Sequence, residues 1–251
     1  MIATIQFPHT SIRVDLSNPL DISLPVKKGH SVNAFYIPPV KIEPLKMGDF
    51  IGSVAEGGSC NVNNIIFNPH GNGTHTECVG HISETFYSIN DTLKQFHFLA
   101  VLITVTPELQ SNGDKIITLD AVKPLLKEVE HTSALIIRTR PNANEKREHQ
   151  YSSTNPPYVD PALMTFINTK GFKHFLIDLP SVDKEDDGGL LSAHHSFWDY
   201  PHAIRMENTI TELIFVPDDI EDGYYLLNLQ ISSFENDASP SKPVLYKIIS
   251  A

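Results

Sequence analysis

Several classes of protein are excluded by what this sequence lacks. Cysteine occurs only at Cys60 and Cys78 in 251 residues, which is too few for a disulfide framework. A formal net charge of −11 argues against a basic surface for nucleic acid. All apolar runs stop well short of the ~20 residues that a membrane-spanning helix needs. The N-terminal residues, interrupted early by Pro8, do not form a signal peptide, so a cytoplasmic location is expected.

Familiar catalytic signatures are also missing. The chain has no His-Glu-x-x-His zinc-protease motif, no Gly-x-Ser-x-Gly nucleophile elbow and no Gly-x-x-x-x-Gly-Lys phosphate loop. Cys78 has no electropositive neighbours that would activate its thiol, so a small buried side chain is the favoured interpretation. With 41% hydrophobic residues, the chain can still bury a substantial core.

The most informative segment is residues 70–81, His-Gly-Asn-Gly-Thr-His-Thr-Glu-Cys-Val-Gly-His. Its glycines allow a tight turn on which side chains can converge. His75 and Glu77 lie two residues apart, and in an extended segment such positions project from the same face. His81 can face the same point from beyond the turn. Imidazole and carboxylate together suit zinc, manganese or iron, although a polar surface loop would have the same composition.

The same segment resembles the signature His-x-Gly-Thr-His-x-Asp-x-Pro-x-His. This signature marks the cyclase family of metal-dependent hydrolases, which includes the bacterial-type kynurenine formamidases and the isatin hydrolases. The positions that match in type and spacing are Gly73, Thr74, His75, Glu77 and His81.

Three positions depart from that signature. The first histidine of the family aligns with Gly71, and His70 stands one residue early. The family's aspartate is Glu77, and its proline is Val79. We therefore expect His70 to replace the missing ligand if the turn shifts by one residue.

The second half of the chain supplies further matches. Residues 175–183, Phe-Leu-Ile-Asp-Leu-Pro-Ser-Val-Asp, are similar to the Ile-Asp-Thr-Pro-Ser-x-Asp segment of the family. In the family, a His and a Glu twelve residues apart join the metal site. His195 and Glu207 keep that interval, whereas His194 would require a one-residue insertion.

Periodicity predicts many strands and few helices. The expected strands are 12–16, 33–38, 62–68, 99–106, 134–139, 174–179, 212–216, 225–232 and 244–249. Helices are expected at 120–129 and at 160–169, where Asp160 is a candidate N-cap. The polar stretch 142–157 is predicted to be a long flexible loop or arm.

The expected fold class is α/β, and residues 1–251 are expected to form one domain because no linker divides the chain. The resemblance implies a swivelling β/β/α domain with a mixed sheet. The strand-rich pattern agrees with that fold class.

The resemblance implies metal-assisted hydrolysis of a small amide or cyclic amide by zinc or manganese. It assigns His75, Glu77 and His195 as metal ligands, with Glu207 as a ligand or as an orienting neighbour, and His81 as the group that moves the proton. His70 is the candidate for a second ion or a fifth coordination position.

A second hypothesis stays open at this stage. The departures at Gly71 and Glu77 allow a metal-free member that keeps the fold and acts as a binding or scaffold protein. Under either hypothesis a homo-oligomer is expected, because the family forms dimers and larger assemblies. Under the first hypothesis the partner is a small-molecule substrate.

Overall fold

A mixed sheet that closes on itself is the central feature of the computed structural model, which describes residues 1–250. Within these residues seven strands form the barrel in the order β17-β16-β9-β12-β14-β15-β8, and β8 pairs back with β17. Strands β9, β12, β14 and β15 run parallel, and the other pairings in the barrel are antiparallel. Their bounds are β8 His75–Glu77, β9 His97–Val105, β12 Ala134–Thr139, β14 His174–Ile177, β15 Thr209–Glu212, β16 Gly223–Ile231 and β17 Ala238–Ser250. The expectation of a mixed, strand-rich α/β fold with few helices is confirmed.

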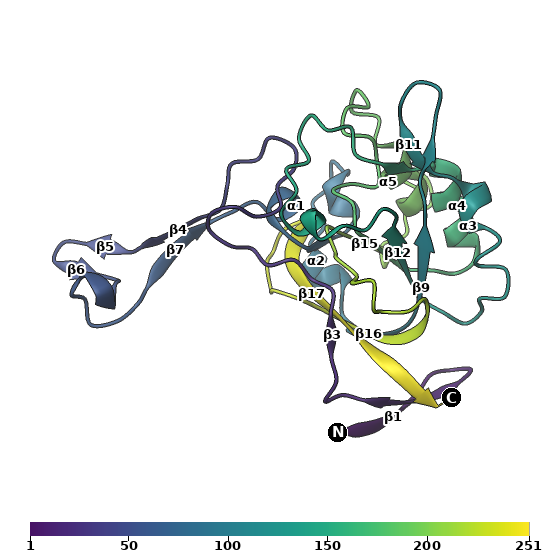
Figure 1. Ribbon diagram of the computed structural model, residues 1–251, viewed down its shortest axis with the longest axis horizontal. Coiled ribbons are helices and arrows are strands. Elements are labelled where there is room, and N and C mark those ends of the chain that lie inside the picture. The colour runs from purple at the N-terminus through teal and green to yellow at the C-terminus, as the bar shows by residue number, and fades with distance from the viewer. Residues whose placement is uncertain (251) are drawn as a thin grey trace.

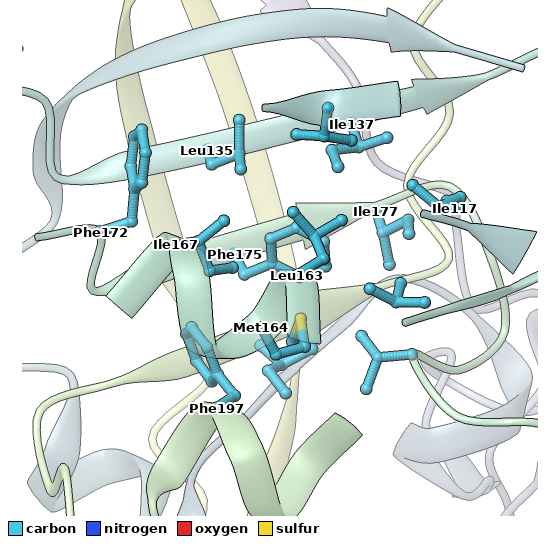
Figure 2. Close-up of a cluster of buried hydrophobic side chains, with 14 of the residues drawn as sticks. Ile117, Leu135, Ile137, Leu163, Met164, Ile167, Phe172, Phe175, Ile177 and Phe197 are labelled. Atoms are coloured by element: carbon cyan, nitrogen blue, oxygen red, sulfur yellow. The ribbon is translucent and has the colours of Figure 1, made fainter. Parts of the chain in front are cut away.

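The central strands are buried on both faces, which explains their continuous apolar sequences. In β12, Leu135 and Ile137 face the helices, whereas Ala134 and Ile136 face the barrel interior. Figure 2 shows Leu135 and Ile137 packed with Phe175 of β14 and with the apolar side chains of the neighbouring helix. The barrel wall therefore separates two hydrophobic clusters.

Three helices cover the outer face of these strands: α3 (Leu119–Val122), α4 (Pro161–Thr169) and α5 (Ser192–Trp198). Asp160 caps α4 as predicted, since its side chain accepts a hydrogen bond from the backbone of Ala162. The helix predicted at 120–129 is shorter than expected. Thr118 caps it, and only turns follow α3 around Pro124, whose ring disfavours a continuing helix.

Smaller elements surround the barrel. The hairpin of β1 and β2 extends the sheet from β17, and β3 also pairs with β17. The bounds of these elements are β1 Ile2–Gln6, β2 Ser11–Asp15, β3 Leu20–Asp21, β10 Glu108–Leu109, β11 Lys115–Ile117, β13 Tyr158–Val159, α1 Pro69–Asn72 and α2 Ile89–Thr92. Across residues 1–250, no helix has the length and hydropathy to cross a bilayer.

A hairpin arm projects from the body (Figure 1). Strands β4 (Lys41–Pro44) and β7 (Asn63–Ile66) form its stem, and β5 (Lys46–Met47) and β6 (Phe50–Ile51) lie near its tip. Residues 142–157, for which we predicted a long flexible loop or an arm, do not project as an arm but lie against the body. Lys146 bonds to the carboxylate of Asp178, and the side chain of Tyr151 is buried.

Two of the predicted strands are not formed as expected. Residues 33–38 make a turn, because Phe35 and Tyr36 both have a left-handed backbone with φ of 55°. The strand predicted at 212–216 lies earlier, since β15 ends at Glu212 and Leu213 has φ of 54°. This early end places Glu212 at the last position of β15, opposite His75 of β8.

Candidate metal centre

Strand β8 lies at the seam where the barrel closes. Its residue His75 is opposite Glu212 of β15, and Glu77 is opposite Ala238 of β17. His75 and Glu77 project from the same face because they are two residues apart in a strand, and both are fully buried. Nε2 of His75 lies 3.4 Å from Oε2 of Glu212. The seam thus gathers one imidazole and two carboxylates.

Helix α5 brings a second imidazole to this seam. Nε2 of His194 lies 3.0 Å from Oε1 of Glu77 and 3.8 Å from Oε1 of Glu212. Asp183 fixes the helix and the ring together, since it accepts hydrogen bonds from two backbone amides of α5 and lies 2.6 Å from Nδ1 of His194. The buried ring of Trp198 stacks beside His194 with 5.6 Å between ring centroids.

Two more histidines approach Oε2 of Glu77, whereas His194 contacts Oε1. His70 of α1 has its Nδ1 3.2 Å from Oε2 of Glu77. His81, at the end of the 3₁₀ turn Val79–His81, has its Nδ1 3.8 Å from the same oxygen. Their rings stack with 4.3 Å between centroids. Asp237 lies behind both rings, with Oδ2 2.9 Å from Nε2 of His70 and 3.4 Å from Nδ1 of His81.

The carboxylates strongly favour positive charge in this cluster. Burial opposes protonation of His194, but its hydrogen bonds to Asp183 and Glu77 outweigh burial and raise its pKa to about 10. Burial is likewise outweighed for His70, whose hydrogen bond to Asp237 and the nearby carboxylate of Glu77 raise its pKa to about 10. Burial would raise the pKa of Glu77, but the charge of His81, the hydrogen bond from His194 and the nearby ring of His70 outweigh burial and hold this pKa well below its ordinary value. Glu77 is therefore an ionised carboxylate.

The donor set fits a divalent cation. Nε2 of His75 and Oε2 of Glu77 are buried and have no hydrogen-bond partner among residues 1–250, although a buried polar atom without a partner is costly. The residues of the cluster form two groups that share Glu77, namely His75-Glu77-Glu212 and His70-Glu77-His81. In each group the potential ligand atoms lie within 4.8 Å of one another.

Outer hydrogen bonds point the histidines inward. Nδ1 of His75 lies 3.2 Å from the carbonyl oxygen of Gly73, which accepts its hydrogen and leaves Nε2 facing the seam. Asp183 does the same for His194, and Asp237 for His70. An acceptor on the outer nitrogen is the usual support of a metal-binding histidine. The arrangement can hold one cation, or two that share Glu77.

The family of the chain follows from comparison with known sequences. The Cyclase family model matches residues 14–184, which is more than half of the chain. The chain belongs to the Cyclase family. The matched range covers β8 and its flanking histidines, whereas His194, Glu212 and Asp237 lie beyond it, so their place in the site comes from the structure.

Individual relatives agree with this membership. Kynurenine formamidase of Bacillus anthracis is 26% identical over 241 residues, covering 95% of this chain and 99% of that protein. The enzyme of the same name from Bacillus cereus is 25% identical over 241 residues, with the same coverage of both chains.

Solved structures show the same fold. Isatin hydrolase A from Labrenzia aggregata has a TM-score of 0.67 and 14% identity, covering 92% of this chain and 94% of that chain. A predicted metal-dependent hydrolase from Bacillus stearothermophilus has a TM-score of 0.62 and 15% identity, covering 91% of this chain and 98% of that chain.

The structure brings four of the predicted Cyclase-family site residues together. They are Glu77 and the three histidines around its carboxylate, His70, His75 and His81. Cys78, which follows Glu77, is a buried residue whose Sγ contacts the carbonyl oxygen of Tyr87.

The geometry also explains the glycine that replaces the first family histidine. A Cβ at Gly71 would lie 2.5 Å from Cδ1 of Ile37 and 2.9 Å from the backbone oxygen of Ala34. The segment before the arm therefore occupies the space of a side chain at this position. His70, one residue earlier, reaches the cluster instead.

The other two predicted ligands, His195 and Glu207, do not join the cluster. Successive residues of a helix point about 100° apart, so His194 and His195 cannot face the same ion. Nδ1 of His195 instead meets the carbonyl oxygen of Tyr200 at 3.0 Å. Glu207 precedes β15, is exposed and pairs with Lys173. Glu207 also lies at the rim of a cavity of about 690 Å³ that none of the cluster residues line.

Sequence reasoning missed Glu212 and Asp237. Glu212 could have been suspected, because a lone acidic residue inside the apolar stretch 209–216 demands a partner when buried. Asp237 gave no such signal, since it lies in a polar loop before β17. Only the pairing of β17 with β8 brings this loop to the histidines.

Proposed function

We propose that this chain is a metal-dependent hydrolase that cleaves the C–N bond of a small amide, of the arylformamide or cyclic-amide type. The observation that carries this proposal is the buried, convergent set around Glu77, in which Nε2 of His75 and Oε2 of Glu77 have no hydrogen-bond partner among residues 1–250. Membership of the Cyclase family and the names of the relatives supply the substrate class.

The residues have separate roles in this mechanism. His75, Glu77, His194 and Glu212 would hold a zinc or manganese ion, and His70 would hold a second ion through Glu77. A bound divalent cation supplies Lewis acidity and makes water acidic near neutral pH. His81 takes the proton of the attacking water and delivers it to the leaving nitrogen, since imidazole can do both near neutral pH. The ionised Glu77 balances the cationic charge.

The test begins with protein purified without chelator. Its zinc and manganese content is measured, and hydrolysis of an N-formyl arylamine is followed by absorbance before and after chelator treatment. We expect at least one ion per chain, loss of activity on its removal, and recovery with zinc or manganese. A metal ratio well below one that neither metal restores would favour the scaffold hypothesis.

We also propose that the arm mediates a homo-oligomer. All four residues of β7 are exposed, including the adjacent Ile65 and Ile66, and an isolated two-stranded hairpin has little stability of its own. A second copy of the chain would cover both faces of the hairpin arm. Light scattering should show that Ile66→Asp dissociates the oligomer, whereas Leu109→Asp, at a similarly exposed site outside the arm, should not. Equal behaviour of the two variants would contradict this role. The cytoplasmic location stays a prediction.

A further inference from the structure

Asp237 occupies a fixed position behind two histidines of the candidate metal centre. Its backbone oxygen accepts the amide of Cys78 at 3.0 Å, just before the turn that carries His81. The preceding residue, Asn236, accepts the amide of Ile89 at 2.8 Å. The following residue, Ala238, begins β17 and pairs with Glu77. Three backbone contacts therefore fix this carboxylate relative to the cluster.

The two histidines present different nitrogens to Asp237. Oδ2 lies 2.9 Å from Nε2 of His70 but 3.4 Å from Nδ1 of His81. An ionised carboxylate only accepts hydrogen bonds, so the contacting nitrogen of each ring must carry the hydrogen. The free lone pair of a neutral His70 is then on Nδ1, which lies 3.2 Å from Glu77. The free lone pair of a neutral His81 is on Nε2.

We propose that Asp237 is a positioning residue that gives these two histidines different roles. It directs Nδ1 of His70 toward the cation, and it occupies Nδ1 of His81 so that Nε2 is left for proton transfer. This inference rests on the proposed function. It also decides between two roles for His81, whose Nδ1 would otherwise be available as a ligand beside Glu77 at 3.8 Å.

Variants at Asp237 separate these effects. Asp237→Ala removes the acceptor for both rings, whereas Asp237→Asn keeps one uncharged acceptor oxygen. The matched control is Glu235→Gln, on the same loop, because Glu235 bonds to Asn90 and to none of the histidines. Metal-free proteins are titrated with Zn²⁺ against a chromophoric chelator, and kcat and KM are measured on the N-formyl arylamine with saturating zinc. Thermal melting confirms folding.

We expect Asp237→Ala to weaken zinc affinity by ~10–100-fold, as is usual when an outer hydrogen-bond partner of a ligand is lost. Its kcat should fall at least ~10-fold at saturating zinc, with little change in KM, because His81 is no longer held. Asp237→Asn should recover zinc affinity to within a few-fold of wild type but not recover kcat, since its single amide oxygen can serve His70, the nearer ring, and leaves Nδ1 of His81 without an acceptor. Glu235→Gln should match wild type in every measurement.

The contrary outcomes distinguish a failure of the proposed function from a failure of the role assigned to Asp237. Wild-type protein that binds no zinc would remove the proposed function and this inference with it. Wild-type protein that binds zinc while folded Asp237→Ala binds it equally tightly, with the same kcat, would overturn only the role of Asp237. Loss of one ion per chain in both Asp237 variants would show that Asp237 is itself a ligand.

Discussion

Replacing His194 with alanine should damage the protein far more than the same change at His195. The two residues are neighbours on α5, so the substitutions share backbone, helix position and chemistry. His194 is buried between Asp183 and Glu77, whereas His195 is half-buried with a single bond to a backbone oxygen. Any difference between the two variants therefore reports which face of α5 the substituted histidine occupies.

The magnitude follows from the two carboxylates that lose their partner. Breaking a buried charged pair by removing one member costs ~3–5 kcal/mol. For a chain of this length each kcal/mol corresponds to ~2–4 °C in Tm, so metal-free His194→Ala should melt ~6–20 °C below wild type. Loss of one hydrogen bond at His195 costs ~1 kcal/mol, or ~4 °C at most.

The difference should also depend on pH. In the metal-free protein the pKa of His194 is raised from its ordinary 6.5 to about 10, mainly by its hydrogen bonds to Asp183 and Glu77 against the effect of burial. A raised pKa stabilises the folded state fully below pH 6.5, and this stabilisation is lost as the pH rises toward 10. The gap between wild type and His194→Ala should therefore narrow between pH 7 and pH 9.

The assay is thermal unfolding of chelator-treated wild type, His194→Ala and His195→Ala at several pH values. Zinc titration of the same samples should show that His194→Ala has lost tight binding while His195→Ala retains it. Equal melting temperatures for the two variants, or loss of zinc binding only at His195, would refute the placement of α5 against Glu77.

Three further predictions concern other parts of the chain. Burial lowers the pKa of His174 to about 3, so the folded state should lose ~2 kcal/mol as the pH falls from 7 to 5. Urea denaturation should show that loss in wild type but not in His174→Gln, and parallel curves would argue against a buried neutral imidazole. Gly71→Ala should destabilise the fold by ~1–3 kcal/mol by overpacking, and adding Ile37→Ala should recover part of that loss in thermal melts, because the close contact with the backbone oxygen of Ala34 remains; absence of recovery would mean that Ile37 is not an obstacle. His81→Ala should retain bound metal but lose ~10²–10⁴-fold in turnover, whereas His75→Ala should lose the metal, and equal metal loss in both would make His81 a ligand.

The part of the site that lies within residues 70–81 was predictable from sequence, because the spacing of its residues along the chain determines their geometry. His75 and Glu77 share a face through the two-residue period of a strand, and His70 and His81 lie within seven residues of both. The same holds for β12 and β9, whose unbroken apolar sequences are set by burial on both faces. In each case the deciding distance along the chain is short.

The distant half was not predictable by counting residues. The choice between His194 and His195 is made by Asp183, which fixes the rotation of α5 through two amides and one ring nitrogen. The choice of Glu212 over Glu207 is made by where β15 begins and ends in the sheet. Both choices depend on tertiary structure, which the twelve-residue interval between a His and a Glu does not predict.

The arm shows the same limit at the level of the fold. The pattern of residues 62–68, which contain Val, Ile, Ile and Phe among asparagines, predicted a strand, and β7 forms there. The pattern does not reveal that this strand pairs only with β4, away from the barrel, because an apolar strand facing a partner chain and one facing a core have the same composition. The polar stretch 142–157 was misleading for the opposite reason. Its side chains bond to the body through groups such as Lys146, which a count of apolar residues ignores.

Closure of the barrel connects these observations to the chemistry. Strand β8 is only three residues long, yet it pairs with β15 on one edge and with β17 on the other. Glu212 is the last residue of β15, and Asp237 immediately precedes β17. The groups around Glu77 therefore come together only when both pairings form. Two of the buried atoms gathered there, Nε2 of His75 and Oε2 of Glu77, have no hydrogen-bond partner among residues 1–250, so closure of the barrel leaves them available to a cation.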